Sequence, residues 1–419
     1  MSDIRFEGWL HGSGTGGVYQ DSAGNVGIAS TQPKTRLDIQ NGAFQIGPAG
    51  ICTATTVNTT NIINATPLSN RNKVINGAVI IAQRGTSHSP GGSDQKYFID
   101  QFQHIATTGA SFDATVTQDS SAPDGFSKSY KVTPDATNTP TGGGNAMFRM
   151  KLEGQDVQDL NYGSSSAKQV TVSFYAKSAS ANNGDQYTFQ LRHFATDGTQ
   201  RSINAPFTIT SSFQRFTFTF EGDTAVDIIN SSALGMELDW QLASGPDDIT
   251  SQQTSWTTTN LFTCVTGQSN FLDSTSNEFY LTGVQLEIGS VATPFEHRSF
   301  CDELARCQRY YFRFTTSVSG THVAMGHQMT SSAAKIVLPF PTSMRQRPTS
   351  VETSGTATDY SVARTSTYEV CNSVPTFAGA SKEVGNVNTS QVQASLSTGI
   401  AVVLRANTTS FFLGFSAEI

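Results

Sequence analysis

Alternation of apolar and polar residues with a period of two constrains this fold more than any other feature of the sequence. In residues 168–180, KQVTVSFYAKSAS, every second position is apolar: Val170, Val172, Phe174 and Ala176. Three further segments repeat the pattern: QYTFQLRHFA (186–195), SSFQRFTFTFEGD (211–223) and NEFYLTGVQLEIG (277–289). Successive side chains of a strand point to opposite faces, so each segment indicates a half-buried β-strand. Turn-forming clusters separate the segments, and the whole predicts an antiparallel sandwich or jelly roll.

Residues 299–312, SFCDELARCQRYYF, switch to helical spacing. Ser299 is placed to act as N-cap, with Asp302 three positions on. Leu304, Cys307 and Tyr311 then recur at intervals of three and four and form an apolar stripe. Strand patterns resume downstream. The segment therefore predicts a short connector helix between two β domains, with an apolar face that docks on one neighbour or both.

At 419 residues the chain is too long for one compact core, and the pattern predicts an all-β protein in several parts. We expect an N-terminal β-rich segment over 1–71 and a central jelly-roll sandwich over 72–298. The connector helix follows over 299–312, and a small β-sandwich tip domain occupies 313–419.

The N-terminal segment carries two hairpin signals. GGVYQDSAGNVGIAS places turn formers at residues 21–25 between short apolar runs, and TRLDIQNGAFQIG places Asn41-Gly42 between two more. Such a segment buries too little apolar surface by itself to offset its ordering entropy, so we expect partner chains to order it. A disordered tail is the alternative.

Composition excludes some classes of function. The net charge is −7, and Lys and Arg form no cluster, which argues against a nucleic-acid partner. No apolar run approaches the roughly 20 residues that span a bilayer, and the first residues lack the pattern of a secretory signal. Five scattered cysteines indicate free, mostly buried thiols rather than a disulfide framework: Cys52, Cys264, Cys301, Cys307 and Cys371. A virion protein, folded in the host cytoplasm and released by lysis, would combine these properties.

Several motifs resemble a region that recurs in tail-fibre and related proteins of bacteriophages and prophages, which is similar to jelly-roll carbohydrate-binding modules. The motifs are KVINGAVIIAQRGTS (73–87), LEGQDVQDL (152–160), VTVSFYAKS (170–178) and LTGVQLEIGSVATPFEHRSFCDELARCQRYY (281–311). GNVGIASTQPKTRLDI (24–39) also resembles an element of phage fibres and trimeric adhesins, although Ala29 and Gln32 replace its usual Gly and Ser.

This resemblance implies a homotrimeric structural protein of the virion, a tail fibre that attaches to other virion proteins through its N-terminal segment. Its distal β domain would adhere to host surface glycans. The alternative is a capsid or tail decoration protein, such as a head fibre, with a purely structural role. Neither function inserts into a membrane.

Three carboxylates in the motif EGQDVQDL, namely Glu153, Asp156 and Asp159, form the densest acidic group of the predicted sandwich. Carboxylate oxygens suit Ca²⁺, so these residues are candidate calcium ligands, although their spacing lacks the tight arrangement of a calcium loop. Solvated turn carboxylates are the alternative. His322 and His327 are a second pair of conceivable metal ligands, but five residues apart on a strand they should point to opposite faces.

Aromatic side chains are the other resource for sugar binding, because a flat ring stacks on the apolar face of a pyranose. Trp256 lies in a polar stretch, and Tyr360 and Tyr368 lie in the tip domain, so these three are candidate carbohydrate contacts. Trp240 alternates within a strand pattern and is expected in the core.

Nothing in the sequence indicates catalysis, and we expect no enzyme. No nucleophile motif, phosphate-binding loop or zinc-type cysteine pair is present. A glycan depolymerase would need two carboxylates across the scissile bond at a fixed separation. Asp247 and Asp248 indicate only a loop tip.

Overall fold

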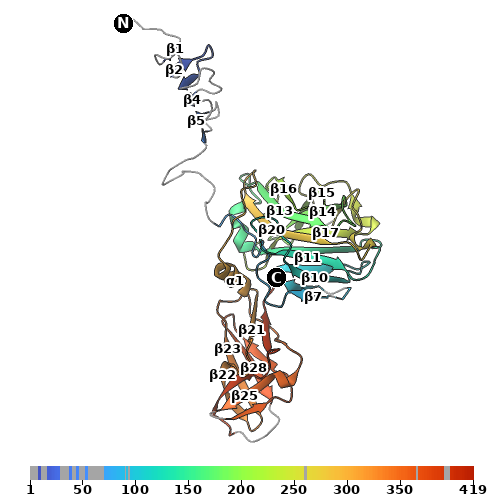
Figure 1. The fold of residues 1–419 in the computed structure, drawn as a ribbon, viewed down its shortest axis with the longest axis vertical. Coiled ribbons are helices and arrows are strands. Elements are labelled where there is room, and N and C mark those ends of the chain that lie inside the picture. The colour runs from blue at the N-terminus through green and yellow to red at the C-terminus, as the bar shows by residue number, and fades with distance from the viewer. Residues whose placement is uncertain are drawn as a thin grey trace. The chain divides into compact units, whose positions relative to one another are not determined.

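A computed structural model describes the chain over residues 8–10, 17–28, 37–39, 44–46, 52–54, 70–89, 91–92, 95–258, 262–364, 367–390 and 397–419. The fold is nearly all β, as the period of two predicts, with 45% of the described residues in strands and 7% in helices. The chain divides into two compact units, residues 1–65 and 66–419 (Figure 1). In the described part of the chain, no helix is long and apolar enough to cross a membrane.

The first unit contains a sheet of short strands in the order β1-β2-β3-β4-β5-β6. These are β1 (Gly8–Leu10), β2 (Gly17–Gln20), β3 (Val26–Ile28), β4 (Leu37–Ile39), β5 (Phe44–Ile46) and β6 (Cys52–Ala54). The predicted hairpin around Asp21 is confirmed: β2 pairs antiparallel with β3, and the Asp21 carboxylate accepts the N–H groups of Ala23 and Asn25 at 2.9 Å. β4 and β5 also pair antiparallel, while the predicted Asn41-Gly42 turn lies outside the described residues.

The second unit begins with a sandwich of two six-stranded sheets. The first sheet has the order β16 (Gln214–Phe220), β13 (Val170–Ser178), β20 (Phe279–Ile288), β11 (Ser129–Pro134), β10 (Ala114–Asp119) and β7 (Ser87–His88). The second has the order β15 (Gln200–Thr208), β14 (Gln186–Phe194), β17 (Leu234–Ser244), β12 (Asn145–Glu153), β9 (Phe102–Ala106) and β8 (Lys96–Ile99). Every pairing within these sheets is antiparallel.

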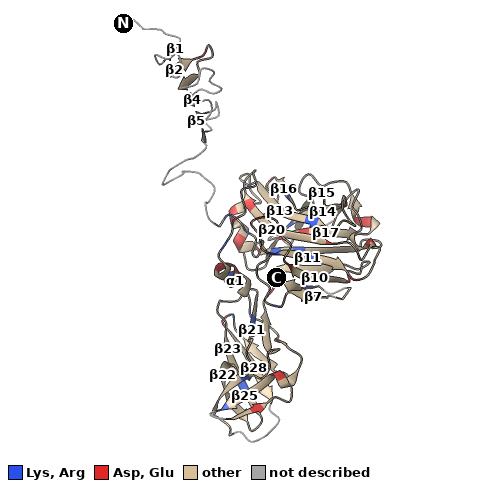
Figure 2. Cartoon of the chain, viewed as in Figure 1, with Lys and Arg blue, Asp and Glu red and all other residues tan. Residues whose placement is uncertain are grey.

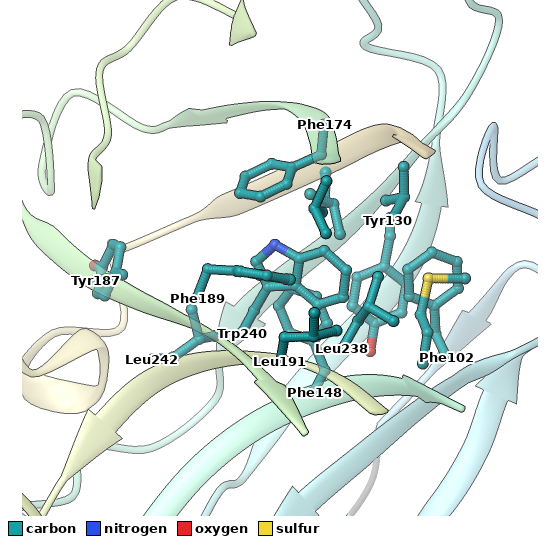
Figure 3. Packing of buried hydrophobic residues seen from close by; sticks show 14 of the residues in the cluster. Phe102, Tyr130, Phe148, Phe174, Tyr187, Phe189, Leu191, Leu238, Trp240 and Leu242 are labelled. Atoms are coloured by element: carbon teal, nitrogen blue, oxygen red, sulfur yellow. The ribbon is translucent and has the colours of Figure 1, made fainter. Parts of the chain in front are cut away.

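The sandwich core is built from the alternating residues that the sequence singles out. Val170, Val172, Phe174 and Ala176 of β13 are all buried. Trp240 of β17 lies at the centre, as predicted, with its ring stacked on Phe148 at 5.3 Å and edge-on to Phe174 and Phe189 (Figure 3). Aromatic pairs in such geometries contribute beyond their buried area.

At one glycine, the alternation of inward and outward residues along β20 shifts by one position. The core-facing residues are Phe279, Leu281, Val284 and Leu286, in which the step from 281 to 284 breaks the period of two. Gly283 lies between them with a φ of 64°, at a bulge opposite Ser173 and Tyr175 of β13. A bulge adds one residue to a strand, so all four apolar side chains reach the same core.

The C-terminal part is a smaller sandwich. A seven-stranded sheet has the order β26 (Thr367–Val370), β25 (Tyr360–Arg364), β29 (Ala401–Ala406), β22 (His322–Thr330), β23 (Ala333–Pro339), β28 (Val384–Ser390) and β27 (Thr376–Ala380). A three-stranded sheet of β21 (Tyr311–Thr315), β30 (Phe412–Ser416) and β24 (Glu352–Thr353) lies against it. Their shared core includes Ile336, Leu338, Leu404, Leu413 and Phe415.

Remaining short elements are the 3₁₀ helices η1 (Gly154–Leu160), η2 (Pro246–Asp248), η3 (Phe271–Asp273) and η4 (Ala357–Asp359), and the strands β18 (Ile249–Thr250) and β19 (Cys264–Val265). Of the four cysteines with described side chains, all are free, and only Cys301 is exposed. Charged residues are sparse and scattered over both sandwiches (Figure 2).

The helix α1 (Phe300–Gln308) joins the two sandwiches, and Ser299 caps it by accepting the Asp302 N–H. It ends four residues before the predicted end at 312, because Tyr311 and Phe312 pair with β30 instead. Its apolar face docks in part as predicted: Cys307, with Leu304 beside it, packs with Ile75 and Ile81 of the central part, and Tyr310 just after the helix joins them, whereas Tyr311 of the predicted stripe lies on β21. The helix is thus a packed junction rather than a free linker.

Candidate functional site

The candidate calcium ligands serve the junction between the sandwiches instead. Glu153 is fully buried, and its two carboxylate oxygens accept hydrogen bonds from Arg309 at 2.6 and 2.8 Å. The Tyr310 hydroxyl donates to the same group at 2.7 Å. Both partners lie just after α1, so Glu153 is a structural anchor of the C-terminal part. The assignment of Glu153 as a calcium ligand is corrected, because its oxygens are already hydrogen-bonded.

The other two carboxylates of that motif do not converge with it. Asp159 forms an exposed ion pair with Lys73 at 2.6 Å. Burial, followed by the nearby Glu153 charge, raises the pKa of Asp156. Among the described residues, no group of three or more His, Cys, Asp or Glu side chains is placed to hold a metal ion. His322 and His327 are both exposed on β22, where a bulge after His322 changes the alternation.

The outer face of the second sandwich sheet carries a cluster of charges that sequence analysis missed. Arg149 of β12 and Arg192 of β14 lie on the two strands that flank β17, and both contact Glu237 and Asp239 of β17. The Arg192 Nε to Asp239 distance is 2.9 Å, and Arg192 is only 2% exposed. All four charges are buried. Burial alone would lower the pKa of Arg149, but the negative charges of Asp239 and Glu237 have the larger combined effect and raise this pKa.

A chain segment covers this face. We call residues 249–258 and 262–268 the strap. Phe262 of the strap lies under the Arg192 guanidinium, 4.3 Å from ring centroid to Cζ. The Thr263 hydroxyl accepts hydrogen bonds from Gln190 and Asn204 at 3.1 and 2.9 Å. The strap thereby closes the polar face of a sheet that would otherwise offer a row of hydrogen-bonding side chains to a ligand.

Trp256, the first carbohydrate candidate, anchors the strap. Its indole N–H donates to the Glu221 carbonyl at 2.7 Å, and its own carbonyl accepts from Arg201 at 2.9 Å. The ring lies edge-on to His193 and Tyr162, with centroids 4.9 and 5.6 Å away. The structure therefore half-buries Trp256 against the sandwich core and engages both its ring and its indole N–H.

Tyr360, the second candidate, is corrected to a core residue. It is fully buried in the C-terminal sandwich, and its hydroxyl donates to the Phe412 carbonyl at 2.6 Å while accepting the Ser354 N–H at 2.8 Å. A ring with no accessible face cannot stack on a sugar. The alternation of β25 explains the position, because Tyr360 and Val362 share the inward face of the strand.

Tyr368, the third candidate, is 52% exposed on the outer face of the seven-stranded sheet. Strand register places Tyr368 opposite Ala363 and Ala363 opposite Val403, with Arg405 two residues further along β29. The Arg405 guanidinium lies over one face of the Tyr368 ring, 4.1 Å from its centroid. The two residues share a shallow cavity of about 210 Å³ that is also lined by His322, Ala363, Arg364, Thr367 and Val403. We call this the Tyr368 pocket.

Two arginines of this pocket were not predicted as site residues. Arg405 belongs to the strand segment GIAVVLRANT, in which Val402 and Leu404 are buried and Arg405 occupies the outward phase. An arginine at an outward position of an otherwise apolar strand was a usable signal. Arg405 comes close to Tyr368 because β25 lies between β26 and β29 in the sheet. No local sequence pattern reveals this strand order.

A larger cavity of about 640 Å³ lies at the junction of the two sandwiches, with Arg84, Arg313, Glu352 and Glu418 among its lining residues. Burial raises the pKa of Glu418 to about 7, against the charge of Arg84. Arg84 approaches Glu418 at 3.0 Å and Glu352 at 3.9 Å. The two carboxylates therefore share one guanidinium, which also stacks on Tyr311 at 3.4 Å. The Arg84 guanidinium therefore holds Glu418 and Glu352 in place at the junction.

Comparison with known proteins gives no match to a family model and none to a curated protein sequence. Three similar solved structures are the following. The enzymatically active domain of tailspike protein 4 of bacteriophage CBA120 is 16% identical, with a TM-score of 0.30, over 52% of this chain and 22% of that one. A family 11 carbohydrate-binding module of Clostridium thermocellum is 13% identical, with a TM-score of 0.26, over 49% of this chain and 98% of that one. A sugar-binding protein described as putative, from Bacteroides thetaiotaomicron, is 8% identical, with a TM-score of 0.30, over 52% of this chain and 100% of that one.

Proposed function

We propose that this chain is a structural fibre protein of a bacteriophage virion, a homotrimer that adheres to host surface glycans. The N-terminal segment would attach the fibre and hold three copies together. The Tyr368 pocket would be the contact with the glycan. Several copies per particle would raise the effective affinity of a weak site by orders of magnitude.

The observation that carries the proposal is the exposure of Tyr368 on an open sheet face. It is the one sugar-stacking candidate whose ring the structure leaves substantially exposed, and it shares its pocket with side chains that donate hydrogen bonds. By contrast, the polar face of the central sandwich is closed by the strap. The motif resemblance to phage fibres supports the rest of the proposal.

A decoration protein with a purely structural role is the second candidate, and the packed junction favours it. Fully buried Glu153 accepts hydrogen bonds from the partly exposed Arg309 and from the buried Tyr310, and Arg345 donates to the Ser232 carbonyl of the central sandwich and to the Ala417 carbonyl of its own. Such a junction transmits force between parts of an appendage whether or not it binds a sugar.

The full-length chain tests the proposal in two measurements. Light scattering should give a trimer at micromolar concentration, and a monomer would contradict the fibre assembly. The labelled protein should also bind host cells, and Tyr368→Ala should lower that binding while Met325→Ala, which alters an exposed side chain outside the pocket, leaves it unchanged. Trimers that bind no cells would favour the decoration role.

A further inference from the structure

We infer that the Tyr368 pocket selects an acidic sugar, one whose ring carries a carboxylate, over its neutral counterpart. The inference rests on the proposed function and names the class of glycan. It follows from the charges that line the pocket, from the partners those charges have, and from the size of the cavity.

The lining is one-sided in charge. Arg364 and Arg405 contribute two guanidinium groups and His322 contributes an imidazole, whereas no Asp or Glu is among the described lining residues. Glu369 is next to Tyr368 in sequence, but it pairs across from Val362 and does not line the pocket. The side chains of this pocket that can carry a charge near neutral pH are therefore all basic, in a protein with a net charge of −7.

The arginines retain donors for a ligand. Arg405 donates through Nη1 to the Ser361 hydroxyl and the Asn407 carboxamide oxygen, at 3.3 and 2.9 Å. Arg364 donates from Nε to the Thr367 hydroxyl at 3.3 Å. These acceptors are neutral, and a guanidinium has five N–H donors. Neither arginine forms an ion pair with a carboxylate among the described residues, so neither positive charge is neutralised.

The aromatic ring supplies the second half of the recognition. Arg405 covers one face of Tyr368, and half of the side chain remains exposed. A pyranose stacked on the uncovered part would keep its carboxylate within a pocket lined by the two arginines. A cavity of about 210 Å³ is the size of one sugar residue rather than of a long chain. Arginine binds carboxylates in pairs of parallel hydrogen bonds, which a neutral hydroxyl or ester cannot reproduce.

Matched acid and ester glycans test this directly. The full-length chain is titrated with oligogalacturonate and with a sialyl-oligosaccharide, each beside its methyl ester, which removes the charge and keeps the ring. We expect the acids to bind about tenfold more tightly than the esters, with the difference shrinking at high ionic strength. Arg405→Gln and Arg364→Gln should each lower affinity for the acid several-fold and leave the ester unchanged.

Control variants separate the pocket from general charge. Arg347→Gln removes an exposed arginine of the same sandwich outside the pocket and should change nothing. Tyr368→Ala should weaken acid and ester alike, beside Met325→Ala as its control. Circular dichroism of each variant checks the fold. Arg364→Gln keeps the test available if Arg405→Gln misfolds, because the Arg364 side chain donates one hydrogen bond within the described part of the chain, to an exposed threonine.

The remaining outcomes distinguish the inference from the function beneath it. Equal binding of acid and ester, lost in Tyr368→Ala, would overturn the charge selectivity and leave glycan adhesion standing. Acid binding that none of the pocket variants alters would overturn the inference and the assignment of the Tyr368 pocket as the contact, and would leave glycan adhesion itself standing. Inorganic phosphate competing as well as the acidic sugar would overturn the role of the ring. Binding to no glycan, acidic or neutral, by a folded protein would overturn the inference and the proposed adhesion together.

Discussion

Two arginines in this molecule lie over aromatic rings at nearly the same distance, in opposite settings. In the central sandwich, Arg192 lies 4.3 Å from the Phe262 ring, is 2% exposed and pairs with Glu237 and Asp239. In the C-terminal sandwich, Arg405 lies 4.1 Å from the Tyr368 ring, which is half exposed, and its hydrogen bonds go to the neutral side chains of Ser361 and Asn407. Both arginines stack on a ring. Carboxylates of the protein neutralise the charge of Arg192, whereas the hydrogen-bond partners of Arg405 are neutral.

That difference indicates what each pair does. A buried guanidinium must be compensated by carboxylates of the protein, because an unpaired charge in the interior is very costly. Once compensated, it has nothing left to offer a ligand. An arginine at the surface needs no such partner and keeps its charge for an external anion. Exposure and pairing, rather than the aromatic contact, therefore separate structural arginines from candidate recognition residues.

The largest predicted effect breaks the buried pair. Arg192→Ala leaves two buried carboxylates with less compensation, so we expect it to lower the free energy of unfolding by about 3–5 kcal/mol. Arg405→Ala should cost less, about 1–2 kcal/mol, because it removes hydrogen bonds to neutral groups, one of them on the buried Ser361, and leaves no buried charge unpaired. Urea denaturation followed by circular dichroism measures both. Equal losses in the two variants would contradict the comparison.

The junction offers an intermediate case. Arg84 stacks on Tyr311 and pairs with Glu418, a buried carboxylate that is itself costly to ionise. Burial raises the pKa of Glu418 to about 7 from an ordinary value of 4.5. The folded protein then holds the proton more tightly than the unfolded chain does. The contribution of Glu418 to stability is fully present below pH 4.5 and is lost as the pH rises towards 7, by up to about 3 kcal/mol.

Comparison of wild type with Glu418→Gln isolates this contribution. The variant keeps the shape of the side chain and cannot ionise, so wild type should lose stability relative to it between pH 5 and 8. Asp100 and Glu352 also lie near Glu418 and remain in both proteins. Unfolding by urea at several pH values gives the difference, and a difference that stays constant with pH would show that Glu418 does not titrate in this range.

Sequence reasoning reached the strands and the core but not the pairing of distant charges. Val170, Phe174 and Trp240 follow from alternation, and Ser299 follows from capping chemistry. Tyr360 and Tyr368 could not be told apart, because both lie in a polar stretch and only the phase of two paired strands buries one and exposes the other.

Glu153 shows a second limit of the same kind. Three acidic residues within seven positions suggest a shared ligand, yet Glu153 binds Arg309, which lies 156 residues away in sequence. Contacts of such separation are set by topology, and local spacing carries no information about them. The Tyr368 pocket is likewise assembled from β22, β25, β26 and β29.

A smaller effect tests whether the strap closes the sandwich face. Trp256→Ala removes a half-buried anchor and should lower stability by about 1–2 kcal/mol. Cys264 is a fully buried residue of the strap itself, and burial raises the pKa of its thiol to about 12. Its alkylation, followed by peptide mass spectrometry, should accelerate at least several-fold in the variant. The exposed Cys301 is the internal control and should react at an unchanged rate. Unaltered protection of Cys264 would contradict an anchoring role for Trp256.

The smallest effect on stability belongs to Tyr368. Truncation of a half-exposed ring on an open sheet face should change the free energy of unfolding by no more than about 0.5 kcal/mol, since little apolar area is removed from the interior. Tyr360→Ala, eight residues earlier in the same sheet, should cost several kcal/mol because it empties a core position and leaves the Ser354 N–H without its acceptor. A large loss in Tyr368→Ala would mean that the ring supports the sheet through Arg405, and would move this pair into the structural class with Arg192 and Phe262.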